Sequence, residues 1–149
     1  MKKIIVLILF MLTSSLLLGC NNNKDTKTSF LEKVSNTLGY KVDGVLETFF
    51  ENGRKQSEFN VYYKNPNNLK VVLQNVENSD KQIILKNADG VYVLVPSVNK
   101  NFKIKSSWPT NASYPYLLQS LAQDITNDNE AIITETETTY TIQTKTKMH

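Results

Sequence analysis

The chain has 149 residues, with 17 Lys or Arg, 14 Asp or Glu, one Cys and one His. Because the two signs of charge are nearly balanced and mixed along the chain, the composition gives no indication of a nucleic-acid-binding protein. The His is the last residue, His149, and the lone Cys is Cys20, so the chain cannot build a Cys/His dyad, a His-based triad or a zinc cluster. We therefore expect no enzyme activity and no metal or other cofactor.

The N-terminus has the three regions of a secretory signal peptide. Lys2 and Lys3 precede an unbroken apolar run at residues 4–12, and a short cleavage region follows. The apolar stretch falls short of the ~20 residues that a membrane-spanning helix needs. Residues 1–19 are therefore predicted to be removed, which leaves 15 basic against 14 acidic residues.

The sequence Leu17-Leu18-Gly19-Cys20 resembles the lipobox of bacterial lipoproteins. The resemblance implies cleavage between Gly19 and Cys20 and a diacyl lipid, of the palmitate kind, on the Cys20 sulfur. Each buried CH₂ contributes ~0.8 kcal/mol, so two acyl chains anchor a protein stably. We expect the protein on the extracytoplasmic face of the cell membrane. The alternative is an ordinary secreted protein with an incidental Cys.

After the anchor, residues 20–28 are polar and are predicted to form a flexible tether, and residues 29–149 to form one domain. Ser29 and Glu32 have the spacing of a capping box. The apolar residues from Phe30 to Leu38 recur at helical spacing, and Gly39 follows them. This pattern predicts a short helix over residues 30–38.

From Tyr40 onward the apolar period changes to two, which is typical of strands. Asn52-Gly53 predicts a type I′ hairpin turn with positive φ at both residues. Because tight polar turns join the strands, we expect an antiparallel meander rather than βαβ units. The predicted strands cover residues 40–51, 54–64, 69–74, 81–86, 91–95 and 99–105.

The last part of the domain is predicted to contain a helix and a hairpin. The helix begins near Tyr114-Pro115, with proline in its first turn, and runs to about Ile125. A Thr-rich, solvent-facing hairpin follows at residues 131–135 and 139–146. The fold class is α+β: a curved antiparallel sheet with helices packed on its concave face.

The order of many small motifs resembles the LolA-like lipoproteins of spore-forming Gram-positive bacteria, the family of the germination lipoprotein GerS and related sporulation lipoproteins. These motifs are Tyr40-Lys41-Val42-Asp43-Gly44, Tyr63-Lys64-Asn65-Pro66, Gln82-Ile83-Ile84-Leu85-Lys86-Asn87, Gly90-Val91-Tyr92-Val93-Leu94-Val95-Pro96, Asn99-Lys100, Ser107-Trp108-Pro109, Asn111 and Tyr116-Leu117-Leu118-Gln119-Ser120-Leu121. The resemblance implies a half-barrel like that of the periplasmic lipoprotein carrier. Such proteins continue with further strands, so we expect the C-terminal strands to be missing here.

The resemblance also implies a function. It suggests a non-enzymatic accessory or binding factor in sporulation or spore germination, acting in cortex peptidoglycan processing through a partner amidase or hydrolase of the envelope. The alternative is a carrier that holds lipid or the acyl chains of lipoproteins in an apolar concave cavity. A concavity filled by the protein's own side chains would argue against the carrier.

Five aromatic residues are candidates for contact with a ligand or partner: Tyr62, Tyr92, Trp108, Tyr114 and Tyr116. For Trp108 we favour a role in the core, because an aromatic residue before Pro commonly fixes a loop on a barrel. Tyr62 and Tyr92 lie on the face opposite Val61 and Val93, where they are expected to be exposed.

Two further patterns remain open. Glu47, Glu58, Asp124 and Asp128 are carboxylates that the fold could bring together, although solvated positions are the more common outcome. The strand at residues 139–146, centred on Ile142, has strong β propensity and little charge, so it can be a free edge guarded by lysines. It can also pair with a second copy, giving a homodimer, or with a partner enzyme.

Overall fold

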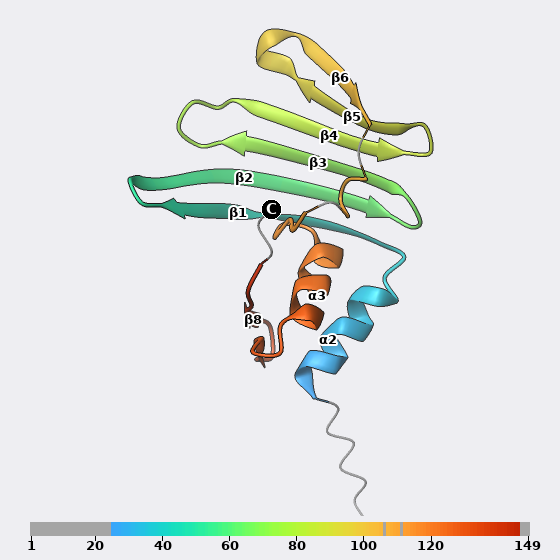
Figure 1. Cartoon of the computed structure of the whole chain (residues 1–149), viewed down its shortest axis with the longest axis vertical. Helices are drawn as coiled ribbons and strands as arrows, with labels where there is room; N and C mark the ends of the chain where they lie inside the picture. The colour runs from blue at the N-terminus through green and yellow to red at the C-terminus, as the bar shows by residue number, and fades with distance from the viewer. Residues whose placement is uncertain (1–24, 106, 111, 147–149) are drawn as a thin grey trace, which may run out of the picture.

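The computed structural model describes residues 25–105, 107–110 and 112–146. Over these residues the protein is α+β, with an antiparallel sheet, a separate hairpin and helices before and after the sheet (Figure 1). The elements are α2 (Thr26–Ser35), β1 (Gly39–Phe50), β2 (Gly53–Lys64), β3 (Asn68–Asn75), β4 (Lys81–Asn87), β5 (Gly90–Val95), η2 (Pro96–Val98), β6 (Lys100–Ile104), α3 (Leu118–Asn127), β7 (Ile132–Glu135) and β8 (Tyr140–Gln143).

The main sheet is a meander in which β1 to β6 follow one another in chain order, every pair antiparallel. The alternation of the sequence sets its two faces, because successive side chains of a strand point to opposite sides. Val61 and Val71 face each other across β2 and β3 and are fully buried. Tyr62, the next residue of β2, points to the opposite face and is exposed. We call the face of Val61 and Val71 the inner face. The predicted strands and their order are confirmed.

The turn between β1 and β2 differs from the prediction in one detail. Phe50 pairs with Gly53, so the two loop residues are Glu51 and Asn52 rather than Asn52 and Gly53. Gly53 is already the first residue of β2 and has a φ of 151°, whereas Asn52 does not have a positive φ. The type I′ assignment was wrong, and the hairpin itself is confirmed. A φ in this range favours glycine, which explains the residue at this position.

The first helix begins earlier and ends earlier than predicted. α2 runs from Thr26 to Ser35 with Asp25 at its N-cap, so Ser29 lies inside the helix and the predicted capping box does not form. Phe30 and Val34 are buried on one side. Leu38 follows the helix and is 75% exposed, because it is not part of the helical apolar stripe.

The second helix begins later than predicted. α3 starts at Leu118, and Pro115 lies in the irregular segment before it rather than in its first turn. Ser120, Asp124 and Ile125 are the buried residues of α3, and Ile125 is completely buried. No helix of the described residues is long and apolar enough to cross a membrane.

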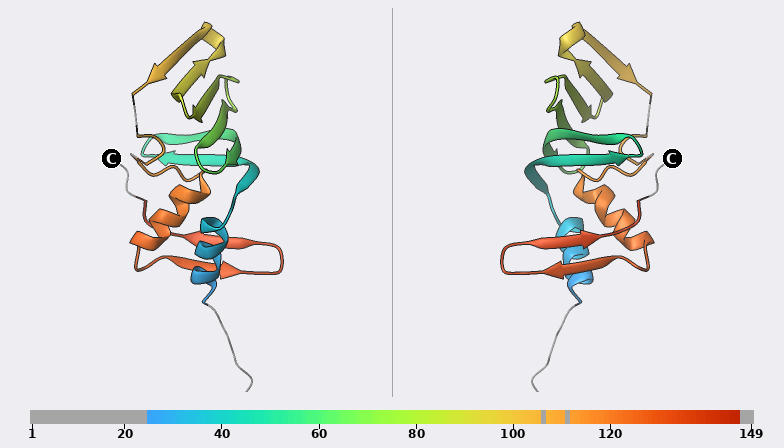
Figure 2. Two further views of the ribbon diagram at one scale, coloured as in Figure 1. Left: turned by 90° about the vertical axis from the view of Figure 1, so that its right-hand side faces the viewer. Right: turned by 90° about the vertical axis from the view of Figure 1, so that its left-hand side faces the viewer.

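The predicted position of the helices on the concave face was wrong. Figures 1 and 2 show α2 and α3 below β1, at one end of the curved sheet, where they contact each other. The inner face is instead covered by the chain that returns from β6 to α3, which we call the crossing segment (residues 107–110 and 112–117). Trp108 and Leu117 of this segment are buried together with Val61 and Val71. These residues, with Leu69, Ile84 and Val91, form the sheet cluster.

A second apolar cluster, the helix cluster, holds the other end of the molecule together. Phe30, Val34 and Ile125 are its buried residues, and Ile133 and Ile142 of the hairpin pack against them. β7 and β8 pair through Ile133 and Ile142, and β7 contacts α2. The final hairpin is thus confirmed, but one of its faces is packed on the helices and only the other faces solvent.

Candidate functional site

Three of the five predicted aromatic residues form one continuous group on the inner face. Trp108 is 4% exposed and meets Tyr114 edge-on, with ring centroids 5.9 Å apart. Tyr114 lies 5.9 Å from Tyr116, which in turn lies 6.1 Å from Phe59 of β2. Such tilted and edge-on pairs add to the free energy of burial. Trp108 is therefore a core residue, as favoured from the sequence.

Two buried polar residues of α3 fix the crossing segment in place. The backbone N–H of Tyr114 donates a hydrogen bond to the Ser120 hydroxyl at 2.7 Å, and the Ser113 hydroxyl donates to the Asp124 carboxylate. Ser120 and Asp124 are each 8% exposed and lie one helical turn apart. Burial, followed by the proximity of Tyr114, raises the pKa of the Tyr116 hydroxyl to about 12. The segment is thus anchored at both its polar and its aromatic residues.

The covering of the inner face by the crossing segment bears on whether the protein could carry lipid. Over the strands that carry the sheet cluster, the inner face is occupied by Trp108, Tyr114, Tyr116 and Leu117 of the chain itself. The carrier alternative stays a prediction that no feature of the described residues tests.

Tyr62 and Tyr92 lie on the outer face of the sheet, as expected. The strand register places them in one row that takes one residue from each strand: Lys41, Tyr62, Lys70, Leu85, Tyr92 and Lys103. The Nζ atoms of Lys41 and Lys70 lie 5.5 and 5.6 Å from the Tyr62 ring centroid. Lys103 Nζ lies 5.4 Å from that of Tyr92. These contacts are cation–π interactions at exposed sites.

The lysines of this row were not singled out from the sequence, because only the register shows that they flank the two tyrosines. Their spacing in the sequence carries no signal, since each comes from a different strand. The row makes the outer face basic and aromatic at one end. It supplies positive charge and flat rings for contact with a partner.

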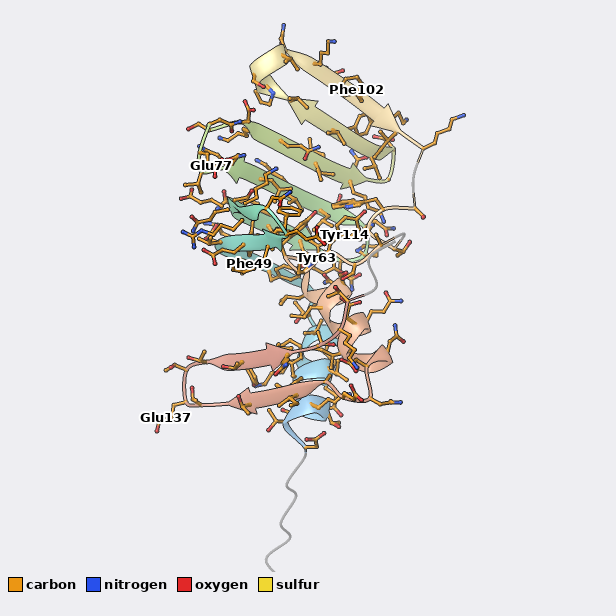
Figure 3. The ribbon with its side chains drawn as sticks, turned by 60° about the vertical axis from the view of Figure 1, so that its left-hand side comes forward. Phe49, Tyr63, Glu77, Phe102, Tyr114 and Glu137 are labelled. Carbon is orange, nitrogen blue, oxygen red and sulfur yellow. The ribbon has the colours of Figure 1, made fainter. Side chains whose placement is uncertain are left out.

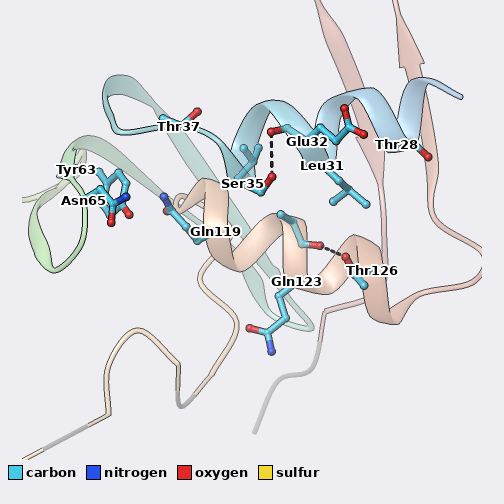
Figure 4. Close-up of a pocket in the computed structure, with 12 residues that line it drawn as sticks. Thr28, Leu31, Glu32, Ser35, Thr37, Tyr63, Asn65, Gln119, Gln123 and Thr126 are labelled. Atoms are coloured by element: carbon cyan, nitrogen blue, oxygen red, sulfur yellow. Dashed lines mark hydrogen bonds between the residues drawn. The ribbon is translucent and has the colours of Figure 1, made fainter. Parts of the chain in front are cut away.

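A groove of about 570 Å³ lies between α2 and α3 (Figure 4). Its floor is apolar and its rim carries amides and hydroxyls. The hydroxyls of Ser35 and Thr126 bond back to carbonyl groups of their own helices. The lining residues are Thr28, Leu31, Glu32, Val34, Ser35, Thr37, Tyr63, Asn65, Gln119, Ala122, Gln123 and Thr126.

The groove offers hydrogen bonds rather than charge. Asn65, Gln119 and Gln123 contribute amide groups, and the Tyr40 hydroxyl at its edge donates to Gln119 Oε1 at 2.8 Å. Burial is the main reason that the pKa of Tyr40 is raised. Glu32 is the one ionisable carboxylate of the lining. Sequence reasoning missed this groove, because its residues come from two helices and a turn that are far apart in the sequence.

The four carboxylates considered as candidate catalytic pairs do not come together: two lie on the sheet and two at α3. Glu47 and Glu58 lie on the outer face of the sheet, where Glu47 is 3.6 Å from Arg54 Nη1. Asp124 is buried under the crossing segment. Asp128, at the end of α3, accepts hydrogen bonds from the backbone N–H groups of Glu130 and Lys145 at 2.9 and 2.8 Å. Each of these two aspartates has a structural partner, which accounts for its position without catalysis.

Two predicted sites concern the ends of the chain. Gly19 and Cys20 lie outside the described residues, so cleavage and lipidation stay predictions. Ile142 is half-buried in β8, opposite Ile133. Among the described residues, β8 pairs with β7 alone, so pairing of its other edge with a copy or a partner also stays a prediction.

Fold and surfaces together define an α+β protein with an open, curved antiparallel sheet whose inner face is partly covered by its own chain. The chain is similar to a curated protein named sporulation protein YdcC from Bacillus subtilis (strain 168), with 36% identity over 150 residues. The match covers 97% of this chain and 44% of that protein, so the chain spans less than half the length of its relative. No protein-family model matches the chain, and no solved structure matches it.

Proposed function

We propose that this protein is a non-enzymatic, lipid-anchored accessory factor in sporulation that acts through a partner protein of the cell envelope. The observation that carries the proposal is the 36% identity to a protein named for sporulation over 97% of this chain. Germination, cortex peptidoglycan processing and an amidase or hydrolase partner belong to the proposal through the resemblance to LolA-like lipoproteins.

The chemistry of the described residues supports an accessory role. The carboxylates of Asp124 and Asp128 accept hydrogen bonds that hold the fold, and the rings of Tyr114 and Tyr116 pack on each other. The exposed features are an amide-rich groove, a row of lysines and tyrosines, and a free sheet edge. Surfaces of this kind bind other molecules without needing a reactive group.

The role in sporulation is tested by deleting the gene in its spore-forming host and counting heat-resistant and germinating spores. We expect a defect that the full-length wild-type gene restores. The gene with Cys20→Ala should restore it poorly, because a protein without the acyl chains is not held at the membrane. Spores of the deletion strain that form and germinate like those of the parent would contradict the proposal.

Anchoring is tested separately by labelling cells with an alkyne analogue of palmitate and separating membrane from soluble fractions. Wild-type protein should carry the label and sediment with membranes, whereas the Cys20→Ala variant should not carry the label. A label on the variant, or a wild-type protein that is soluble and unlabelled, would show that the anchor is wrong.

A further inference from the structure

β6 is an edge strand whose exposure is greater than that of any other strand of the sheet. All its five residues, Lys100–Ile104, are exposed, and in the described part of the chain it pairs with β5 alone. Edge strands present unpaired N–H and C=O groups that can template another strand. The edge of β6 therefore has backbone groups ready for an added strand.

The apolar residues of β6 continue the inner face beyond the part that is covered. Phe102 is directly opposite Val93 and Ile104 is directly opposite the buried Val91, so both point to the inner side. Phe102 is nevertheless 48% exposed and Ile104 37% exposed. Figure 3 shows Phe102 well away from Tyr114, because the crossing segment lies over the strands nearer to β1. An additional strand beside β6 would cover these two side chains.

The segment that contains β6 and the crossing segment carries charge of one sign. From Gly90 to Gln123 the chain has no Asp and no Glu, and its charged residues are Lys100, Lys103 and Lys105. The ion pairs among the described residues join Lys33 to Glu135, Lys41 to Asp43, Arg54 to Glu47 and Lys145 to Glu130, so they do not use the lysines of β6. Lys103 is stacked on Tyr92 of the outer face.

We propose that the β6 edge binds an extended acidic segment of a protein partner as an added strand, with apolar side chains on Phe102 and Ile104 and carboxylates beside the lysines. The inference names a contact surface for the accessory role proposed above, and it rests on that role only in assuming a protein partner. Main-chain hydrogen bonds give such a strand its affinity, and its alternate side chains give it specificity.

The charges favour this partner over a second copy. Pairing β6 with the β6 of another molecule would bring two sets of lysines together, and like charges on adjacent strands are destabilising. An anionic lipid surface would meet the lysines, but it supplies neither backbone groups for the edge nor a reason for Phe102 and Ile104 to stay exposed on the inner side. Lysines that only guard an edge would likewise leave these two residues unexplained.

The test uses the full-length chain and fluorescently labelled synthetic peptides of about seven residues, the length of an ordinary strand. The probe alternates Glu and Val, and fluorescence anisotropy measures its binding. One control peptide has Lys in place of Glu, and another has Pro at the centre. We expect both controls to bind at least about tenfold more weakly than the probe, through lost charge pairing and lost ladder bonds respectively.

Protein variants locate the site. The triple change Lys100→Glu, Lys103→Glu and Lys105→Glu should reverse the preference, so that the basic peptide binds better than the acidic one. The double change Phe102→Thr and Ile104→Thr keeps the β propensity of the strand. It should weaken binding of the probe about tenfold. The matched control is Lys41→Glu with Lys70→Glu on the outer face, which should leave probe binding unchanged. Far-UV circular dichroism verifies that each variant is folded.

Three results would overturn the inference: equal binding of the proline peptide, unchanged binding by the charge-reversed variant, or binding of phosphatidylglycerol vesicles but not of the probe. Its failure can be told apart from that of the proposed function. If the charge-reversed chain still restores sporulation in the deletion strain, the accessory role holds and the β6 edge is not its contact surface. If the edge binds the probe but deletion causes no sporulation defect, the edge holds and the proposed role fails.

Discussion

The two apolar clusters of the molecule are assembled from differently spaced parts of the sequence. The sheet cluster takes most of its residues from successive strands, such as Val61 and Val71, that are joined by tight turns. The helix cluster joins Phe30 to Ile125 and Ile142, which lie about a hundred residues further along. Contacts at such separation have a larger loop-closure cost during folding. The sheet can therefore form by local pairing, whereas the helical end depends on the complete chain.

The two clusters meet at neighbouring residues. Leu117 is buried in the sheet cluster, and the next residue, Leu118, packs on the helix cluster. Because Leu117 is the N-cap residue of α3 and Leu118 is its first residue, a change on one side is felt on the other. We therefore expect a single unfolding transition rather than two.

The largest expected effects come from removing one buried side chain from each cluster. Leu117→Ala and Ile125→Ala should each lower the free energy of unfolding by about 2–5 kcal/mol, measured by urea denaturation. Leu38→Ala, at a position that is 75% exposed, is the control and should change it by less than about 0.5 kcal/mol. If either core variant unfolds in two separate transitions, the two clusters unfold independently of each other.

A smaller loss of unfolding free energy is expected from a change at Gly44, which affects the sheet cluster alone. A Cβ atom at this position would lie 2.6 Å from the ring of Phe59, which covers the glycine. Gly44→Ala should therefore cost about 1–3 kcal/mol of unfolding free energy through overpacking. The double variant with Phe59→Leu should recover part of this loss, because the ring that clashes is gone. An equal loss in the double variant would show that the strain lies in the backbone.

The smallest effect concerns Asp128, which holds the end of β8 to α3. Hydrogen bonds from the backbone of Lys145 and Glu130 hold the pKa of its carboxyl group below the ordinary value. The folded protein thus keeps this group ionised at a pH where the unfolded chain protonates it, so its contribution is present at neutral pH and lost as the pH falls below the normal aspartate range. Asp128→Asn should be slightly less stable at neutral pH and should lose less stability on acidification.

NMR of the hairpin amides during acid titration measures this effect locally. The Lys145 amide should shift with the titration of Asp128 in the wild type and remain unchanged in the variant. Glu77→Gln, a change in an exposed turn between β3 and β4, is the control. Identical acid profiles for wild type and Asp128→Asn would remove Asp128 as the link between α3 and the hairpin.

Much of the sheet could be predicted from the sequence, because strand alternation and turn residues are local signals. The order of β1 to β6 and the exposure of Tyr62 follow from residues that are neighbours in the chain. The helix boundaries were less accurate. Ser29 looks like a cap, but the helix continues through it to Asp25, since Phe30 must reach the helix cluster and tertiary packing overrides the local capping signal.

The placement of the helices and the surfaces could not be predicted in this way. The apolar stripe of α3 shows that one side is buried but not against what, and the actual partners are α2 and the hairpin. The crossing segment has no periodicity at all, so its burial over the sheet carried no signal beyond the aromatic residues Trp108, Tyr114 and Tyr116. The lysines beside Tyr62 and the open edge of β6 emerge only from the register of six strands.

The described chain begins at Asp25, at the end of the molecule opposite β6 (Figure 1). A lipid anchor before this residue, as proposed, would hold α2 and the β7–β8 hairpin next to the membrane. With a spacing of ~4.8 Å between neighbouring strands, β6 stands about 24 Å beyond β1, measured across the sheet. The protein would then act as a spacer, presenting its most exposed strand outward to proteins above the bilayer rather than to those embedded in it.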